Sequence, residues 1–179
     1  MDQVWIGPVT RADAAALIAA NIASGAYHAP WVHPFTDIDG FDTWYGEIAT
    51  GANVGLVARA GPTGPIVGVV NLSQIFRKGF QNAYLAYYGM AAFARRGLMT
   101  RAVGLAVRYA FDDIGLHRLE ANIQPENAAS IALIKRVGFR KEGFSPRYLR
   151  IDDVWHDHER WAILADGPPN VEYERSDRC

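Results

Sequence analysis

The chain has 179 residues and a formal net charge of -1 at pH 7. Half of its residues are hydrophobic and 21% are charged, a composition typical of one ordinary globular domain. This charge balance offers no field that would attract a nucleic acid backbone or an anionic membrane, so neither partner is expected. No apolar run is long enough to span a bilayer, and Met1 to Thr10 does not have the pattern of a secretory signal.

Cysteine and histidine usage argues against disulfides and metal. The single cysteine, Cys179, is the last residue, so an internal disulfide or a cysteine metal cluster cannot form, and we expect a cytoplasmic protein. His156 and His158 share one face of a predicted strand, but the pattern offers no third ligand. We therefore expect no metal.

The first half of the chain predicts helices followed by an antiparallel meander. Residues 25–40 are rich in glycine, proline and aromatic residues, and a long loop of this kind often binds ligands. Short turns separate the three strands that follow, which favours antiparallel pairing. The expected elements are a strand at Val4–Ile6, a helix at Arg11–Ala20 after the N-cap Thr10, a helix at Asp42–Ile48, and strands at Val54–Ala58, Ile66–Ile75 and Ala83–Met90.

The second half predicts alternating helices and strands. A strand–helix–strand unit implies some parallel pairing, so the fold class is α/β (mixed α+β), a mixed, largely antiparallel sheet with helices on both faces. Residues 1–165 are expected to form one domain, followed by a polar tail at 166–179. The expected elements are helices at Leu98–Asp113 and Ala128–Val137, and strands at Arg118–Ile123, Phe139–Glu142 and Val154–Leu164.

The segment between the third meander strand and the next helix predicts an anion site. Backbone N–H groups at the start of a helix attract phosphate, and Gly97 allows a ligand to approach closely. Arg95 and Arg96 add positive charge there. Two arginines are also common in the first turn of a surface helix, so this segment alone leaves both interpretations open. The Walker loop, the dinucleotide fingerprint and the serine hydrolase elbow are all absent from the sequence.

An ordered set of motifs resembles the GNAT superfamily of N-acetyltransferases. Met90–Arg101 is similar to the family's acyl-CoA loop, and residues 124–139 are similar to its N-x-x-[A/S]-x-x-L…G-F motif. The segment Lys141–Phe144, the segment Tyr148–Ile151 and the residues Trp155, Asp157 and His158 resemble the ribosomal-protein-alanine branch. The chain departs from the family at Ala94, usually Gln or Arg, at Arg95, often Gly, and at Ile134, where many members have a catalytic tyrosine.

The resemblance implies acetyl-CoA as co-substrate and direct attack of an amine on the thioester, without an acyl-enzyme. Ser130 then stands where the branch has its suggested proton donor, and Asn127 where it has a pantetheine contact. A polar residue near the start of a capped helix is common in any case, so both residues also have an ordinary structural explanation. The residues expected to bind the co-substrate are Gly89, Met90, Arg95, Arg96, Gly97, Leu98, Met99, Thr100, Asn127 and Lys135.

The acceptor and the base are less defined by the sequence. The backbone around Gly89 and Met90 is expected to stabilise the oxyanion, and water ordered by Glu120 or Tyr88 to relay the proton. Acceptor contacts are expected from Trp31, His33, Tyr87 and Tyr88, whereas core packing explains Trp44 and Tyr45 equally well. The expected acceptor is a protein N-terminus, for a monomer or homodimer; a small amine, such as an antibiotic or polyamine, and a non-catalytic acyl-CoA sensor remain alternatives.

Overall fold

Seven strands form one mixed sheet in the computed structural model, which describes residues 3–29 and 31–166. The strand order is β1-β2-β3-β4-β5-β7-β6, and the pairing of β4 with β5 is parallel while the others are antiparallel. The strands are β1 (Val4–Pro8), β2 (Val54–Ala60), β3 (Ile66–Phe76), β4 (Asn82–Gly89), β5 (Arg118–Ile123), β6 (Arg140–Ile151) and β7 (Val154–Leu164).

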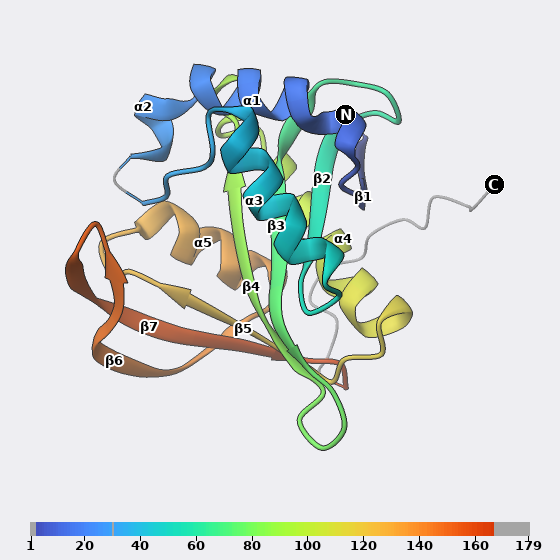
Figure 1. The fold of residues 1–179 in the computed structure, drawn as a ribbon. Helices are drawn as coiled ribbons and strands as arrows, with labels where there is room; N and C mark the ends of the chain where they lie inside the picture. Colours follow the sequence, from blue (N-terminus) through green and yellow to red (C-terminus); the bar gives the residue numbers. More distant parts are fainter. Residues whose placement is uncertain (1–2, 30, 167–179) are drawn as a thin grey trace.

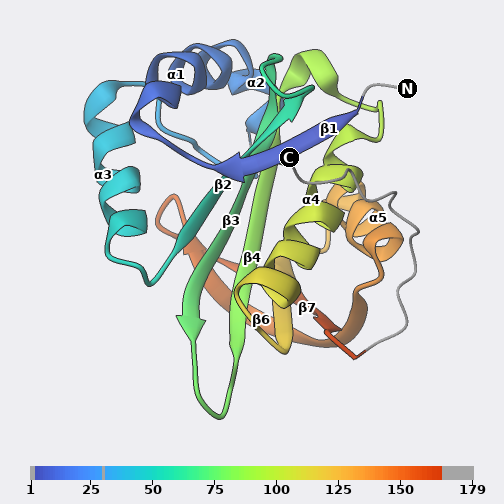
Figure 2. The same ribbon diagram turned by 90° about the vertical axis from the view of Figure 1, so that its right-hand side faces the viewer.

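Helices cover both faces of this sheet, so the expected fold class is confirmed. Figure 2 shows α3 on one side and α4 and α5 on the other. The α-helices are α1 (Ala14–Ala23), α2 (Gly25–His28), α3 (Ile38–Ala49), α4 (Leu98–Arg108) and α5 (Ala128–Val137). Short 3-10 turns occupy Arg11–Asp13 and Ala91–Phe93, and one turn of π-helix over Tyr109–Asp113 continues α4.

Strand periodicity divides the core between the two faces. Val57 and Val69 lie with Leu17 of α1 and Phe41 of α3, whereas Leu56 and Val70 lie with α4 and α5. Successive side chains of a strand point to opposite faces, so β2 and β3 supply both cores. These two apolar layers hold β4 between them, and β4 carries the candidate site.

Three expectations from the sequence need correction. Residues 25–40 are not loop throughout, because α2 occupies Gly25–His28 and α3 begins at Ile38. The Asp37 carboxylate accepts a hydrogen bond from the Gly40 N–H at 2.8 Å and so starts α3 four residues earlier than expected. Strand β6 continues to Ile151 instead of ending at Glu142, because it pairs with β7 along a long hairpin. All but Asp166 of the expected tail lies outside the described residues.

Strands β4 and β5 pair only at their beginnings and then diverge (Figure 1). Their register runs from Asn82 opposite Arg118 to Tyr84 opposite Glu120, although β4 continues to Gly89 and β5 to Ile123. The second half of β4 therefore has a hydrogen-bonding edge that β5 does not use. None of the described helices has the length and apolar content needed to cross a bilayer.

Candidate active site

A cavity of about 380 Å³ lies where β4 and β5 diverge. Tyr87 and Tyr88 both line it, although adjacent residues of a strand point to opposite faces of the sheet. The cavity therefore connects the two faces through the opening between the strands. Its wall is formed by Tyr27, His28, Trp31, Val32, Tyr87, Tyr88, Gly89, Met90, Phe93, Ala94, Arg95, Gly97, Leu98, Met99, Thr100, Asn127, Ala129, Ser130, Ala132, Leu133 and Arg136.

The exposed edge of β4 offers backbone N–H groups to this cavity. The Met90 N–H donates to the Val67 carbonyl at 2.8 Å. Because hydrogen bonds alternate along an antiparallel pair, the N–H groups of Tyr88 and Ala86 also face β3, and those of Gly89 and Tyr87 face the opposite way. Just before β4, the Gln81 carbonyl accepts hydrogen bonds from the N–H groups of His117 and Arg118, where β5 begins.

This alternation changes the expectation for the oxyanion site. The Met90 N–H is already used within the sheet, so Met90 lines the cavity without offering that donor. The Gly89 N–H is directed toward the side that β5 has left. A Cβ on Gly89 would lie 2.7 Å from Cγ of Met99, so the glycine also allows the first turn of α4 to lie against β4.

The loop before α4 turns tightly and supplies the positive end of a helix. Gly97 has φ 73 and precedes Leu98, the first residue of α4. Arg95 has φ 61, a left-handed conformation that costs an L-residue about 1–2 kcal/mol. A helix start carries N–H groups without intrahelical partners and the positive end of the dipole, and the Arg95 side chain adds a cation at the cavity. This arrangement is suited to phosphate groups.

The first turn of α5 is fixed by a cap and by a tyrosine. The Asn127 side chain accepts a hydrogen bond from the Ser130 N–H at 3.0 Å. The Tyr87 hydroxyl lies 2.6 Å from Ser130 Oγ and 3.1 Å from the Ser130 carbonyl oxygen. Burial raises the pKa of Tyr87 to about 12, while its hydrogen bond with Ser130 acts in the opposite direction. Tyr87 therefore stays protonated at neutral pH and holds Ser130 at the cavity wall.

Aromatic side chains form the other end of the cavity. The His28 ring meets the Tyr88 ring edge-on, with centroids 5.2 Å apart, and Tyr27 and Trp31 lie in the same wall. Burial raises the pKa of Tyr88 to about 12, with a hydrogen bond from Asn21 opposing the shift. None of the described residues that line the cavity is Asp or Glu; Arg95 and Arg136 are its charged members.

Four expected site residues are placed elsewhere. Glu120 accepts a hydrogen bond from Arg118 Nε at 2.7 Å, in the part of β5 that still pairs with β4. The Lys135 ammonium lies 5.4 Å from the centre of the Trp161 ring, and Arg96 lies over Phe93. His33 contacts Asp152 at 2.8 Å and links the loop after α2 to the β6–β7 turn. None of the four lines the cavity.

Other cavity residues were missed by the sequence analysis. Leu133 follows Ser130 by three residues on α5, a helical spacing that could have identified it, whereas Arg136, six residues after Ser130, had no such signal. His28 lies within residues 25–40, the segment expected to bind ligands, but its contact with the strand end could not be predicted because it spans 61 residues. Within residues 3–29 and 31–166, no three histidine, cysteine or acidic side chains gather in an arrangement that could hold a metal ion.

Comparison with known proteins identifies the family. Residues 3–140 match the family described as an acetyltransferase (GNAT) domain, so the chain belongs to that family. The [ribosomal protein uS5]-alanine N-acetyltransferase of Escherichia coli is 41% identical over 100 residues, which are 56% of this chain and 52% of that protein. The matched segment thus spans about half the length of the curated relatives.

Solved structures share the fold over nearly the whole chain. Ribosomal-protein-S5-alanine acetyltransferase from Vibrio fischeri superposes with a TM-score of 0.82 at 24% identity, covering 93% of this chain and 95% of that one. RimJ of Mycobacterium smegmatis, solved with CoA-disulfide, gives 0.77 at 30% identity and covers 91% and 82%. Spermidine N-acetyltransferase from Vibrio cholerae, with CoA and spermine, also gives 0.77, at 20% identity, covering 92% and 97%. The fold is therefore shared by enzymes named for different amines.

Proposed function

We propose that this protein transfers the acetyl group of acetyl-CoA to the free α-amine of a protein N-terminus, as the ribosomal-protein-alanine N-acetyltransferases among its relatives are named to do. The observation that carries the choice of acceptor is the aromatic wall without a described carboxylate. A polyamine carries several ammonium groups and is best held by acidic side chains. A single amine on an otherwise uncharged peptide end suits aromatic and apolar walls.

Each group of cavity residues would have a separate role in the reaction. Backbone N–H groups at the start of α4, with Arg95, would hold phosphate groups of the co-substrate. The Gly89 N–H would donate to the thioester oxygen as negative charge develops on it, an effect worth about 3–4 kcal/mol in other acyl transfers. Ser130 Oγ, held by Tyr87, would protonate the departing thiolate. Asn127 would both cap α5 and face the pantetheine arm.

The protonation energy of the acceptor also favours an α-amine. Such an amine has a pKa of about 7.7–8.0, so its neutral form costs under about 1 kcal/mol near neutral pH. A lysine side chain, with a pKa of about 10.4, costs roughly 4 kcal/mol under the same conditions. Without a carboxylate in the described cavity wall, the amine that deprotonates more easily is the better-matched acceptor.

A panel of amines tests the proposal. CoA release from acetyl-CoA would be measured with a peptide that has a free N-terminal Ala or Ser, with a peptide that has a blocked N-terminus and an internal Lys, and with spermidine. The proposal expects release with the first peptide alone. Release with spermidine alone would contradict it and identify a small amine as the acceptor. Acetyl-CoA binding without turnover across the panel would instead support an acyl-CoA sensor.

A further inference from the structure

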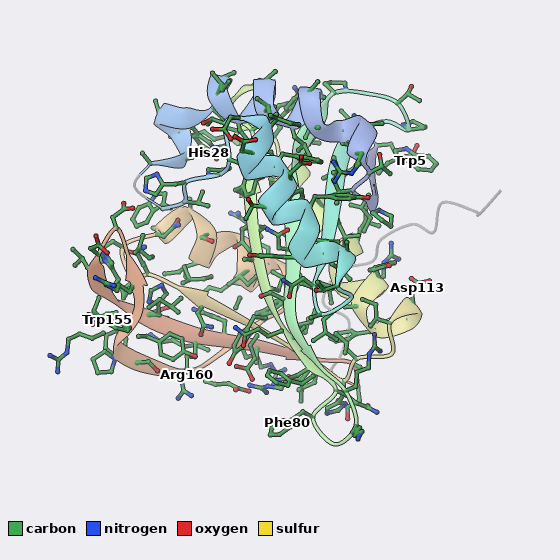
Figure 3. All side chains as sticks on the ribbon, in the orientation of Figure 1. Trp5, His28, Phe80, Asp113, Trp155 and Arg160 are labelled. Atoms are coloured by element: carbon green, nitrogen blue, oxygen red, sulfur yellow. The ribbon has the colours of Figure 1, made fainter. Side chains whose placement is uncertain are left out.

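His28 completes the strand edge that β5 leaves open. It is the last residue of α2, is 3% exposed, and lies beside the end of β4 (Figure 3). Its Nε2 is 2.9 Å from the Gly89 carbonyl oxygen. The Gly89 carbonyl faces the same side as the Gly89 N–H, the side away from β3. The imidazole therefore donates the hydrogen bond that a β5 N–H would otherwise supply.

This contact defines how the ring is protonated. A carbonyl oxygen only accepts hydrogen bonds, so Nε2 carries the proton, and Nδ1 of the neutral ring presents a lone pair. Nδ1 is buried and has no hydrogen-bond partner among the described residues. A buried polar atom left without a partner destabilises the folded state. His28 belongs to the cavity wall, and a donor on the bound ligand would complete Nδ1 once the side chains that cover this atom move aside on binding.

We infer that Nδ1 of His28 is the catalytic base that takes the proton from the acceptor amine, an inference that rests on the proposed acetyl transfer. The Gly89 N–H that would hold the thioester oxygen and the Gly89 carbonyl that holds His28 belong to the same residue. An amine that attacks a carbonyl held there arrives next to the imidazole. Histidine is the side chain whose ordinary titration lies closest to neutral pH, as a general base requires.

The protons balance in this scheme. An incoming R–NH3⁺ gives one proton to Nδ1, which later passes it to water, and the neutral amine forms the N–C bond. The C–S bond then breaks, and the second proton lost by the nitrogen replaces the one that Ser130 Oγ gives to the thiolate. The products are the amide, CoA-SH and one released proton. No acyl-enzyme or metal is needed.

The described groups around His28 are less suited than its imidazole to act as the base. Among the described residues, the titratable rings in contact with it are Tyr88, edge-on with centroids 5.2 Å apart, and Tyr27, with centroids 6.1 Å apart. Burial keeps Tyr88 protonated by raising its pKa to about 12. The charged members of the cavity wall, Arg95 and Arg136, are cations that do not accept a proton. His28 is also the one histidine among the described residues that line the cavity.

A His28→Gln variant distinguishes the hydrogen bond made by Nε2 from the basic lone pair of Nδ1. The Gln amide N–H can still donate to the Gly89 carbonyl, but the basic lone pair is gone. General-base catalysis contributes about 10²–10⁴-fold, so kcat at pH 7 is expected to fall by about 100-fold or more, with acetyl-CoA affinity unchanged. The defect should shrink as pH rises from 7 to 9, because the α-amine, with a pKa of about 7.7–8.0, then deprotonates in water. His117→Gln, at an exposed histidine just before β5 and outside the cavity, is the matched control and should retain activity.

Two further results decide the inference independently of the acceptor. Exogenous imidazole should restore part of the activity of His28→Ala, as a purely structural role would not allow. In nitrogen NMR of the wild-type protein with CoA, the Nδ1 signal of His28 should move when the accepted amine is titrated in. A kcat for His28→Gln within about threefold of wild type, or an unmoved Nδ1 signal, would overturn the role.

The failure of this inference can be told apart from the failure of the proposed acceptor. The variants are compared on whichever amine the wild-type protein acetylates, so turnover of spermidine alone would contradict the N-terminal proposal and still leave His28 measurable. If the protein acetylates none of the amines, the NMR titration with the free-N-terminal peptide decides, and an unchanged Nδ1 signal counts against the base.

Discussion

The hydrogen bond between Tyr87 and Ser130 links β4 to α5 at the cavity wall. If Ser130 protonates the thiolate, Ser130→Ala should lower kcat by about 10–100-fold and leave the KM for acetyl-CoA within about twofold, because the lost contact matters only as the thiolate leaves. Steady-state kinetics with a free-N-terminal peptide would measure both. Ser145→Ala, on β6 and outside the cavity, is the control. An unchanged kcat in Ser130→Ala would remove Ser130 from the mechanism.

The raised pKa values of the two cavity tyrosines predict that the free energy of unfolding falls at alkaline pH. Burial raises the pKa values of Tyr87 and Tyr88 from 10.0 to about 12. A group whose pKa is raised by folding contributes its full stability below the unfolded value, and that contribution is lost as pH rises through the folded value. The free energy of unfolding should therefore fall between pH 10 and pH 12, by at most about 2.7 kcal/mol for each tyrosine.

Urea unfolding at pH 9 and pH 11 would measure this fall. A double variant, Tyr87→Phe with Tyr88→Phe, has no phenol to ionise at either position, so most of the difference between the two pH values should disappear. An equally steep fall in the double variant would mean that other groups cause it.

Individual residues also show what helical periodicity could and could not reveal. The resemblance to the family suggested Lys135 as a co-substrate contact, but residues 129, 132, 133 and 136 of α5 face the cavity, and Lys135 points toward Trp161. The spacing from Ser130 does not separate Lys135 from Arg136, because residues five and six positions along a helix both lie far from it around the axis, so the period alone could not have distinguished them. Strand spacing alone could not place Glu120, because the distance at which β4 and β5 separate is a tertiary feature.

At the scale of elements, two helix caps can be compared, because one lies at the cavity and the other lies outside it. Asn127 caps α5 at the cavity, and Asp37 caps α3 outside it. Replacing either residue by Ala should cost about 1 kcal/mol of unfolding free energy. Asn127→Ala alone should also weaken acetyl-CoA binding, because it loosens the helix end that faces the co-substrate. Thermal unfolding would measure the stability of the two variants, and calorimetric titration would measure their affinity for acetyl-CoA. Equal affinities in both variants would mean that Asn127 only caps the helix.

Two glycines test the close contact between β4 and α4. In Gly89→Ala the new Cβ would lie 2.7 Å from Met99 Cγ, so Met99 must move, and we expect a loss of about 1–3 kcal/mol together with a raised KM for acetyl-CoA. Gly7 on β1 has no such neighbour within 4 Å, so Gly7→Ala should change stability by less than about 0.5 kcal/mol. Wild-type stability and KM in Gly89→Ala would contradict the contact.

Most elements could be predicted because their signals are local. The meander strands, α4 with its π-helical turn, and α5 between Asn127 and Gly138 carry periodicity and caps that a single sequence displays. Helix α2 was missed because its four residues, Gly25–His28, have little local preference. It is held instead by the His28–Gly89 hydrogen bond, between residues far apart in the chain. The same distance hid the contact of His28 with the end of β4.

At the scale of the whole molecule, the divergence of β4 and β5 produces the site. Short parallel pairing at one end of β4, with antiparallel pairing to β3 along its length, leaves one row of backbone groups at the other end unused by β5. Helices on both faces then close the opening with α4 and α5 on one side and α2 on the other. The mixed sheet with its antiparallel meander could be predicted from the sequence, but the opening itself follows from the packing of all these elements.

The most direct test of the proposed function places two competing amines in one acceptor. A peptide with a free N-terminal Ala and an internal Lys would be incubated with the protein and acetyl-CoA, and tandem mass spectrometry would locate the acetyl group. The account predicts acetylation of the N-terminal amine, with the lysine unmodified, because the α-amine deprotonates at lower cost and the cavity wall described here lacks a carboxylate. Acetylation at the lysine, or at both amines equally, would contradict it.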